Sequence, residues 1–459
     1  MNRRIRMRKR AVLALCVGFV MAGHIFANES NVAVTIYNDN LALVRDIRTL
    51  TFQKGVQEFR FVDVAAQMDP TSVHFKSLDP AQPLAILEQN FEYDLVGTSR
   101  LLEKYIDQDV LATIRGGSTV QGTLLSALGD DIIIRTDNGQ IRAVKAAAVE
   151  SIVFPALPNG LITRPTLVWL LDSEKGGAVK SELSYLTSGM SWHAEYVAVV
   201  NDKDTQLDLA GWVSIDNQSG ADYQDAKLKL VAGDVHRAEE RPQYPEMAKM
   251  RVAMAAADES MFEEKSFFEY HLYTLQRPAT VKNRQIKQLS LFEPQTSPVK
   301  KVYSYDGVRD PKKIQVQLEF KNSVENNLGM PLPAGKVRVY KRDSDLSQEF
   351  IGEDNLDHIP KDEIVRLTMG NAFDVVGERN VKRVEKLSER SRQETVEITL
   401  RNHKEENIKV TVIEHFYGDW KFIGKTPEIV KKTADRVEFL VDVAADGETK
   451  FEYTVLSQY

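Results

Sequence analysis

Hydrophobic and polar residues alternate along most of the chain with a period of two, which is typical of half-buried β-strands. Val32, Val34 and Ile36 alternate with smaller or polar residues, and a turn then precedes the next apolar segment. The period of 3.6 residues that marks an amphipathic helix is rare. The pattern predicts an all-β, multi-domain protein with few helices, beginning with an N-terminal β domain over residues 28–96.

Residues 97–155 show a tighter pattern, with one short helix followed by five short strands. Ser99 is the expected N-cap of this helix. One of the turns is Asn138-Gly139, and Asn-Gly between two strands is a strong hairpin signal. This order predicts a small Sm-like or SH3-like barrel. Because the segment has no arginine cluster and no aromatic platform, a structural insert is favoured over a nucleic-acid-binding module.

Longer strands are predicted on both sides of a marked change in composition. Residues 156–235 are expected to form an immunoglobulin-like β-sandwich, and residues 266–459 a C-terminal β-sandwich region. Between them, residues 236–265 are rich in methionine and alanine and predict a flexible or short helical connector, which is favoured over a copper site. Within the C-terminal region we expect one strand over residues 267–275, and a solvated loop or frayed helix over the charged residues 378–393.

The first 27 residues have the pattern of a Sec-type signal peptide: a basic segment, a short apolar run and a small residue, Ala27, at the expected cleavage site. An uncleaved anchor is the alternative, but the apolar run is shorter than the ~20 residues that span a bilayer. Lipidation of Cys16 is disfavoured because Leu15 precedes it, and twin-arginine export fits less well than general secretion. We therefore expect a periplasmic or secreted protein with no stable transmembrane anchor after cleavage.

Charge makes one class of partner improbable, and cysteine content limits how the exported chain can be stabilised. Six of the 59 basic residues lie in the signal segment and none of the 66 acidic ones does, so cleavage makes the chain more acidic than its formal charge of −7. An acidic protein is a poor candidate for nucleic-acid binding, which depends on neutralising phosphates. Cleavage also removes the only cysteine, so the exported chain must be stabilised by burial rather than by disulfides.

Several sequence motifs resemble those of uncharacterised bacterial envelope proteins that carry the domain of unknown function 4139, and more distantly the mucoidy-inhibitor proteins. The resemblance covers nearly the whole exported chain and implies a fold and a compartment, but it supplies no catalytic residues. The stretches that carry it are residues 34–44, 189–196, 211–213, 217–220, 227–234, 337–340, 350–354, 370–374 and 415–420.

The sequence contains no familiar catalytic, phosphate-binding, metal or calcium motif, and we expect no cofactor. The candidate ligand-binding residues combine an aromatic ring with a polar neighbour, as a sugar site requires: Trp192, His193, His415, Asp419 and Trp420. The alternative is that these tryptophans, together with Trp212, are core residues whose N–H groups find partners, and this alternative is favoured.

Two functions from different classes remain. The first is a non-enzymatic adaptor or binding module of the bacterial cell envelope, which would recognise a protein or polysaccharide partner through strand edges or clefts between domains. The second is a carbohydrate-binding or carbohydrate-active envelope protein. A metal-dependent envelope enzyme is a weaker third possibility, and the sequence leaves the oligomeric state open.

Overall fold

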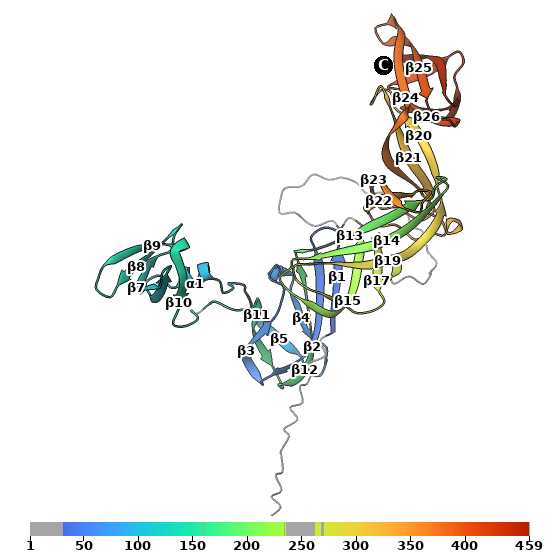
Figure 1. Ribbon diagram of the computed structural model, residues 1–459. Helices are drawn as coiled ribbons and strands as arrows, with labels where there is room; N and C mark the ends of the chain where they lie inside the picture. The colour runs from blue at the N-terminus through green and yellow to red at the C-terminus, as the bar shows by residue number, and fades with distance from the viewer. Residues whose placement is uncertain (1–30, 159, 234, 236–261, 268–269, 459) are drawn as a thin grey trace, which may run out of the picture.

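Strands make up nearly all of the structure, a computed structural model that describes residues 31–158, 160–233, 235, 262–267 and 270–458 (Figure 1). They form five sheets in an elongated molecule. These ranges contain one α-helix, and no helix in them is long and apolar enough to cross a membrane. The prediction of an all-β protein with several sheets is confirmed.

The first sheet has eight strands, which come from two distant parts of the N-terminal half of the chain. Its strand β1 alternates buried and partly exposed residues, as the sequence pattern predicts, and pairs in parallel with β15, which lies far along the chain. Residues from the predicted 28–96 and 156–235 segments therefore share one sheet. The strands, in sheet order, are β16 (Phe262–Phe267), β17 (Tyr270–Leu275), β15 (Tyr223–Ala232), β1 (Asn31–Tyr37), β2 (Ala42–Phe52), β12 (Gly177–Thr187) and β4 (His74–Ser77), with β18 (Ala279–Val281) paired to β15.

Two further sheets pack on the eight-stranded sheet and enclose a first hydrophobic core, to which all three contribute buried side chains. Trp169 lies in the smaller sheet, fully buried among Phe59, Phe61 and Phe75. The three-stranded sheet contains β3 (Gly55–Val62), β11 (Thr166–Ser173) and β5 (Leu84–Glu92). The five-stranded sheet contains, in order, β19 (Gln285–Pro298), β14 (Gln206–Asn217), β13 (Met190–Val200), β22 (Gly335–Arg342) and β23 (Gln348–Leu356).

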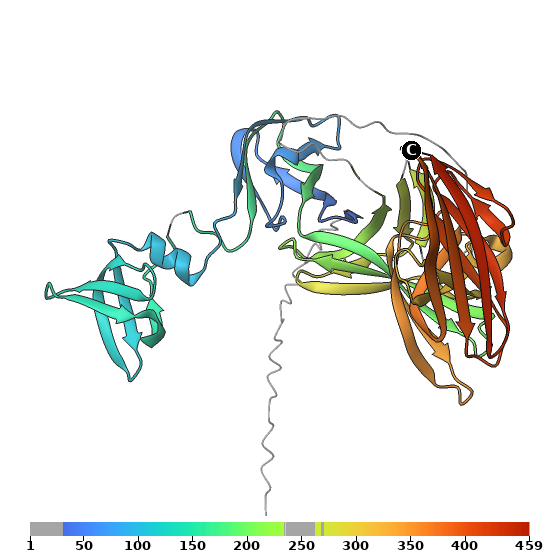
Figure 2. The same ribbon diagram turned by 90° about the horizontal axis from the view of Figure 1, so that it is seen from above.

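A small unit with its own hydrophobic core is inserted between β5 and β11 and projects from the rest of the molecule (Figures 1 and 2). Helix α1 begins at Thr98 with Gly97 as its N-cap, so the expected cap at Ser99 is wrong by two positions. The unit contains α1 (Thr98–Lys104) and a second five-stranded sheet in the order β10 (Val149–Val153), β6 (Asp109–Ile114), β7 (Ser118–Ser126), β8 (Asp131–Thr136) and β9 (Ile141–Lys145).

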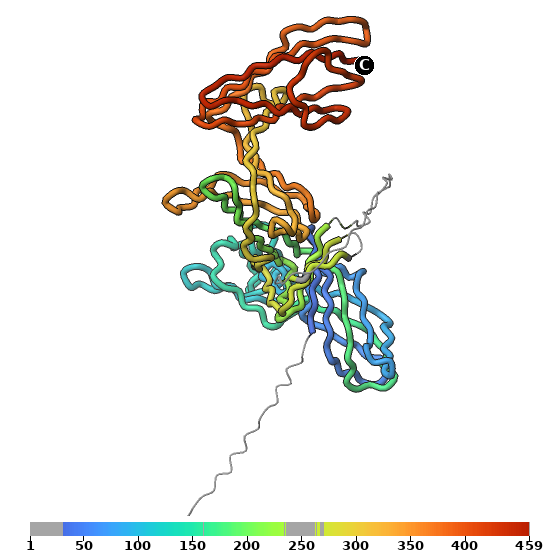
Figure 3. Tube along the Cα trace, turned by 90° about the vertical axis from the view of Figure 1, so that its right-hand side faces the viewer, coloured from blue at the N-terminus to red at the C-terminus, as the bar shows by residue number. Residues whose placement is uncertain are grey.

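The C-terminal part is a nine-stranded sheet with a separate second core. Strand β24 connects the two cores, because Val365 and Leu367 near its start belong to the first and Val375 to the second (Figure 3). In sheet order the strands are β27 (Asp419–Ile423), β30 (Gly447–Gln458), β25 (Ser391–Asn402), β24 (Ile364–Ser388), β21 (Lys313–Lys321), β20 (Lys300–Tyr305), β26 (Ile408–His415), β29 (Arg436–Val443) and β28 (Glu428–Lys432). Three 3-10 turns, η1 (Pro70–Ser72), η2 (Ala146–Ala148) and η3 (Val324–Asn326), complete the described elements.

Two predicted elements are wrong. The single strand expected over residues 267–275 contains the last residue of β16 and all of β17, which pair with each other, and β16 already begins at Phe262, inside the predicted connector. The charged residues 378–393 form the end of β24 and the start of β25, not a loop or helix. The signal segment 1–27 and the methionine-rich residues 247–261 lie outside the described residues.

Candidate functional site

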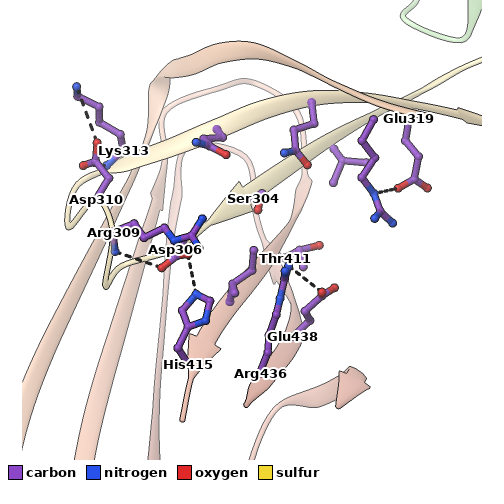
Figure 4. A pocket seen from close by; sticks show the side chains of 15 residues that line it. Ser304, Asp306, Arg309, Asp310, Lys313, Glu319, Thr411, His415, Arg436 and Glu438 are labelled. Atoms are coloured by element: carbon purple, nitrogen blue, oxygen red, sulfur yellow. Dashed lines mark hydrogen bonds and ion pairs between the residues drawn. The ribbon is translucent and has the colours of Figure 1, made fainter. Parts of the chain in front are cut away.

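A groove of about 320 Å³ lies on the outer face of the nine-stranded sheet (Figure 4). It crosses four neighbouring strands, β21, β20, β26 and β29, and also contacts β24 and the turn that follows β20. Its volume is at the lower end of the range for ligand sites. The lining residues are Val302, Ser304, Asp306, Arg309, Asp310, Lys313, Gln315, Gln317, Glu319, Arg366, Thr411, Ile413, His415, Arg436 and Glu438.

Strand alternation explains why polar residues line this groove. Side chains of a strand point to opposite faces in turn, and on β26 Val410, Val412 and Glu414 are buried whereas Thr411 and His415 lie on the outer face. The strand register then places lining residues side by side across the sheet. Gln315, Ser304 and Thr411 form one such row, and His415 is opposite Arg436.

The charges in the groove occur as pairs of opposite sign. The Nε2 atom of His415 lies 2.8 Å from Asp306 Oδ2, and Arg309 contacts the same carboxylate oxygen at 3.5 Å. The remaining pairs, by closest N–O distance, are Arg366–Glu319 at 2.8 Å, Arg436–Glu438 at 2.8 Å and Lys313–Asp310 at 3.9 Å. The groove therefore has nearly balanced charge and offers both donors and acceptors.

Ser304, Asp306 and His415 are the residue types of an acyl-transfer triad, but their arrangement does not form one. Ser304 pairs with Thr411, which is four residues from His415 along β26, or about 13 Å. The Ser304 hydroxyl is therefore beyond hydrogen-bond reach of the His415 imidazole. A nucleophile and its general base must lie within that reach, so these residues do not form a triad. Within the described ranges, moreover, no group of three or more His, Cys, Asp or Glu side chains could hold a metal ion.

Of the five predicted site residues, only His415 lines this groove. Trp192 is in the first core, with 1% of its surface exposed, and its Nε1 donates to the Val231 carbonyl oxygen. His193 is the next residue on β13, so it points to the opposite, solvent-exposed face and contacts Glu195. These two residues therefore do not share a cleft.

Asp419 and Trp420 lie on β27, at the end of the sheet order opposite β28. Trp420 brings these two ends together, because its Nε1 donates to the Ala434 carbonyl oxygen and Lys432 of β28 lies over its ring. The ring also packs on Phe416 at the margin of the second core. Asp419 is exposed beside Gln458. The structure thus does not bring the five predicted residues into one site.

Two sets of residues were not predicted. The first is the pair of strand-borne arginines in the groove, Arg366 and Arg436, which come from strands 70 positions apart and share no local motif. The second is Trp212 on β14, which the sequence favoured as a core residue but which is 41% exposed. Trp212 lies on the outer face of the five-stranded sheet, opposite Glu195 of β13.

These features define an all-β, multi-sheet protein with a charge-balanced groove on its C-terminal sheet. Residues 181–416 match the sequence profile of the domain of unknown function DUF4139. The match covers more than half of the chain, from β12 to just beyond β26, and the protein belongs to this family. A comparison with curated proteins finds no match.

Proposed function

We propose that the protein is a non-enzymatic binding module or adaptor of the bacterial cell envelope, and that the groove holds a short, extended polypeptide segment of a partner protein. The observation that carries this proposal is the composition of the groove. The charged side chains that line the groove have oppositely charged neighbours, and the row of Gln315, Ser304 and Thr411 between them consists of hydroxyl and amide groups.

An extended polypeptide has the chemistry that such a surface recognises. Its backbone presents donors and acceptors in turn, which Gln315, Ser304 and Thr411 can match. Its charged side chains can exchange partners with the ion pairs at the rim. One donor already lacks a protein partner in the part of the chain that the structure describes, because Nε of Arg436 is buried without a hydrogen bond. The lining contains no Phe, Tyr or Trp side chain, so it offers no large aromatic platform for stacking a sugar or a base.

The envelope location rests on the pattern of residues 1–27, which is typical of exported proteins. Cell fractionation tests it directly. The protein is expected in the periplasmic or secreted fraction and shorter than its full sequence by the length of the signal segment. Recovery of the full-length chain from the cytoplasm would contradict this part of the proposal.

The groove is tested by titrating the purified protein with a blocked hexapeptide of alternating lysine and glutamate. We expect binding that weakens with added salt, since the contacts are partly exposed charges. Replacing Arg366 or Arg436 by serine removes a charge-assisted contact, and about a tenfold loss of affinity is expected for each. Lys450→Ser is the matched control, because Lys450 lies on β30 of the same sheet but outside the groove.

Two results would overturn the proposal. The first is peptide binding that is equally strong in the wild type and in both arginine variants, which would place the peptide elsewhere. The second is cleavage of the peptide during the titration, which would identify an enzyme. Mass spectrometry of the recovered peptide separates the two.

A further inference from the structure

Trp212 is a large aromatic residue displayed on an otherwise regular sheet face. Its neighbours on β14, Gly211 and Val213, are buried against the first core. Gly211 is required there, since a Cβ atom at this position would lie 2.4 Å from the Phe292 ring. The indole therefore points outward because the inner face is filled. A tryptophan combines a large apolar ring with a polar N–H group, which is why it is enriched at binding interfaces.

The side chains next to Trp212 form a connected array of charges. Glu195 is directly opposite Trp212, at the Cβ separation of about 5 Å that neighbouring strands impose. Its carboxylate contacts His193 Nε2 at 3.2 Å and Arg338 Nη1 at 3.1 Å. Arg338 also contacts Glu353 at 3.7 Å. These polar groups are thus held in place beside the indole before any ligand arrives.

The array is electrically balanced. Burial on its own would raise the pKa of Glu195, but hydrogen bonds and charges from His193 and Arg338 outweigh it and lower that pKa. Glu195 and Glu353 are therefore balanced by Arg338 and by Lys336, which lies 3.0 Å from Glu353. A surface of this kind has little net attraction for a polyanion or a polycation. It suits a neutral ligand rich in hydroxyl groups.

A second aromatic pair extends the same face. Tyr340 follows Arg338 by two residues on β22, and its ring packs edge-on against Phe350 of β23, which is 55% exposed. From the strand register, Tyr340 is four residues along and two strands across from Trp212, or about 16 Å away. Of the charged array, Glu195 and Arg338 lie between these two aromatic positions, whereas His193 lies on the far side of Glu195 along β13.

We propose that this face of the five-stranded sheet, formed by Trp212, His193, Glu195, Arg338, Tyr340 and Phe350, is a binding site for a neutral oligosaccharide. The apolar C–H face of a sugar ring stacks on an indole, and ring hydroxyls pair with carboxylate and guanidinium groups. The separation of the aromatic positions fits a chain of several sugars better than a single one. The site is separate from the groove and does not depend on the groove binding a peptide.

The test is a binding titration of the purified protein against neutral hexasaccharides of glucose, of mannose and of N-acetylglucosamine, with polygalacturonate as the anionic comparison. At least one neutral hexasaccharide is expected to bind, and its disaccharide to bind more weakly. Trp212→Ala is expected to lower the affinity about tenfold or more, and Trp212→Phe to restore part of it. Circular dichroism and urea unfolding confirm that both variants are folded.

Trp420→Phe is the control, because Trp420 is the tryptophan that joins β27 to β28 and is outside this face. The proposal is overturned if none of the three hexasaccharides binds, if only polygalacturonate binds, or if Trp212→Ala binds as tightly as the wild type. It is also overturned if Trp212→Ala abolishes self-association of the protein and no saccharide binds, since a second copy would then cover the face. The hexapeptide titration is independent, so failure at one site does not imply failure at the other.

Discussion

At the scale of single residues, the most consequential group outside the two proposed sites is the ion pair of Glu414 and Arg379. Glu414 is completely buried on the inner face of β26, directly before His415 of the groove. The Arg379 guanidinium contacts both carboxylate oxygens, at 3.1 and 3.2 Å from Nε and 3.1 Å from Nη2. Burial on its own would lower the pKa of Arg379, but the hydrogen bonds and charge of Glu414 outweigh it and raise that pKa. The Arg379 guanidinium therefore remains charged beside the second core.

Replacing Glu414 by glutamine is expected to lower the free energy of unfolding by about 3–5 kcal/mol, because Arg379 is then left charged and buried without its partner. Urea unfolding followed by circular dichroism measures the change. Glu448→Gln is the control, since Glu448 pairs with Lys450 on an exposed surface and such pairs contribute about 0–1 kcal/mol. Equal effects of the two substitutions would show that burial of the Glu414 pair has no energetic consequence.

At the scale of elements, the close approach of β13 and β22 depends on Gly335. These strands pair in parallel, with Gly335 next to Ala194. A Cβ atom at residue 335 would lie 2.0 Å from the Ala194 carbonyl oxygen, a distance that no relaxation of a side chain can relieve. The pairing holds Lys336 and Arg338 beside Glu195. The geometry of the proposed oligosaccharide face therefore depends on Gly335.

Gly335→Ala is therefore expected to destabilise the protein by about 1–3 kcal/mol, as forced overpacking usually does. The urea midpoint measures this loss. Lys336→Ala, at the next residue, removes only an exposed side chain and its ion pair with Glu353, and a change within about 1 kcal/mol is expected. If Gly335→Ala is as stable as the wild type, the two strands do not approach as closely as the structure shows.

Most strands could be predicted from the sequence because their inner faces are filled by alternating apolar residues. The exceptions have physical causes. The charged residues 378–393 form strands because cross-strand ion pairs such as Lys382–Glu397 join β24 to β25, and β30 pairs with the other side of β25. Composition indicates solvent exposure there, but it does not indicate whether the backbone is paired.

The tryptophans show why the site was harder to predict than the fold. Trp192 alternates with Ser191 and His193, a pattern that already predicts an inward-facing ring. Trp212 is in phase with Asp208 and Asp216, whereas the leucines of β14 lie on the other face, so the alternation already indicates an outward-facing ring. Trp212 was expected in the core because of its residue type, and the strand alternation outweighs that expectation. The groove could not be predicted from the sequence, because its arginines come together only when distant strands become neighbours in the sheet.

At the scale of the whole molecule, the two cores are connected by continuous strands and by the side-chain cluster around Asp204. Asp204, in the turn between β13 and β14, contacts Lys341 of the five-stranded sheet and Lys301 of the nine-stranded sheet. Burial on its own would raise the pKa of Asp204, but hydrogen bonds and charges from both lysines outweigh it and lower that pKa. One carboxylate thus links the part of the protein that carries the oligosaccharide face to the part that carries the groove.

We expect Asp204→Asn to lower the free energy of unfolding by about 2 kcal/mol at neutral pH, since a neutral amide cannot compensate two partly buried ammonium groups. The pKa of Asp204 is lower in the folded protein than its unfolded value of about 3.9. Its contribution to stability is therefore fully present above that value and is lost as the pH falls through the folded pKa. The difference between wild type and variant should shrink over the same interval.

Urea midpoints of the wild type and of Asp204→Asn, measured from neutral pH to about pH 2, test this dependence. Asp442→Asn is the matched control, because Asp442 pairs with Lys409 on an exposed part of the nine-stranded sheet and its removal should change little at any pH. A difference between wild type and Asp204→Asn that stays constant down to the lowest pH would mean that the carboxylate acts through its shape rather than its charge. In that case the continuous strands β21 and β24 alone would couple the two cores.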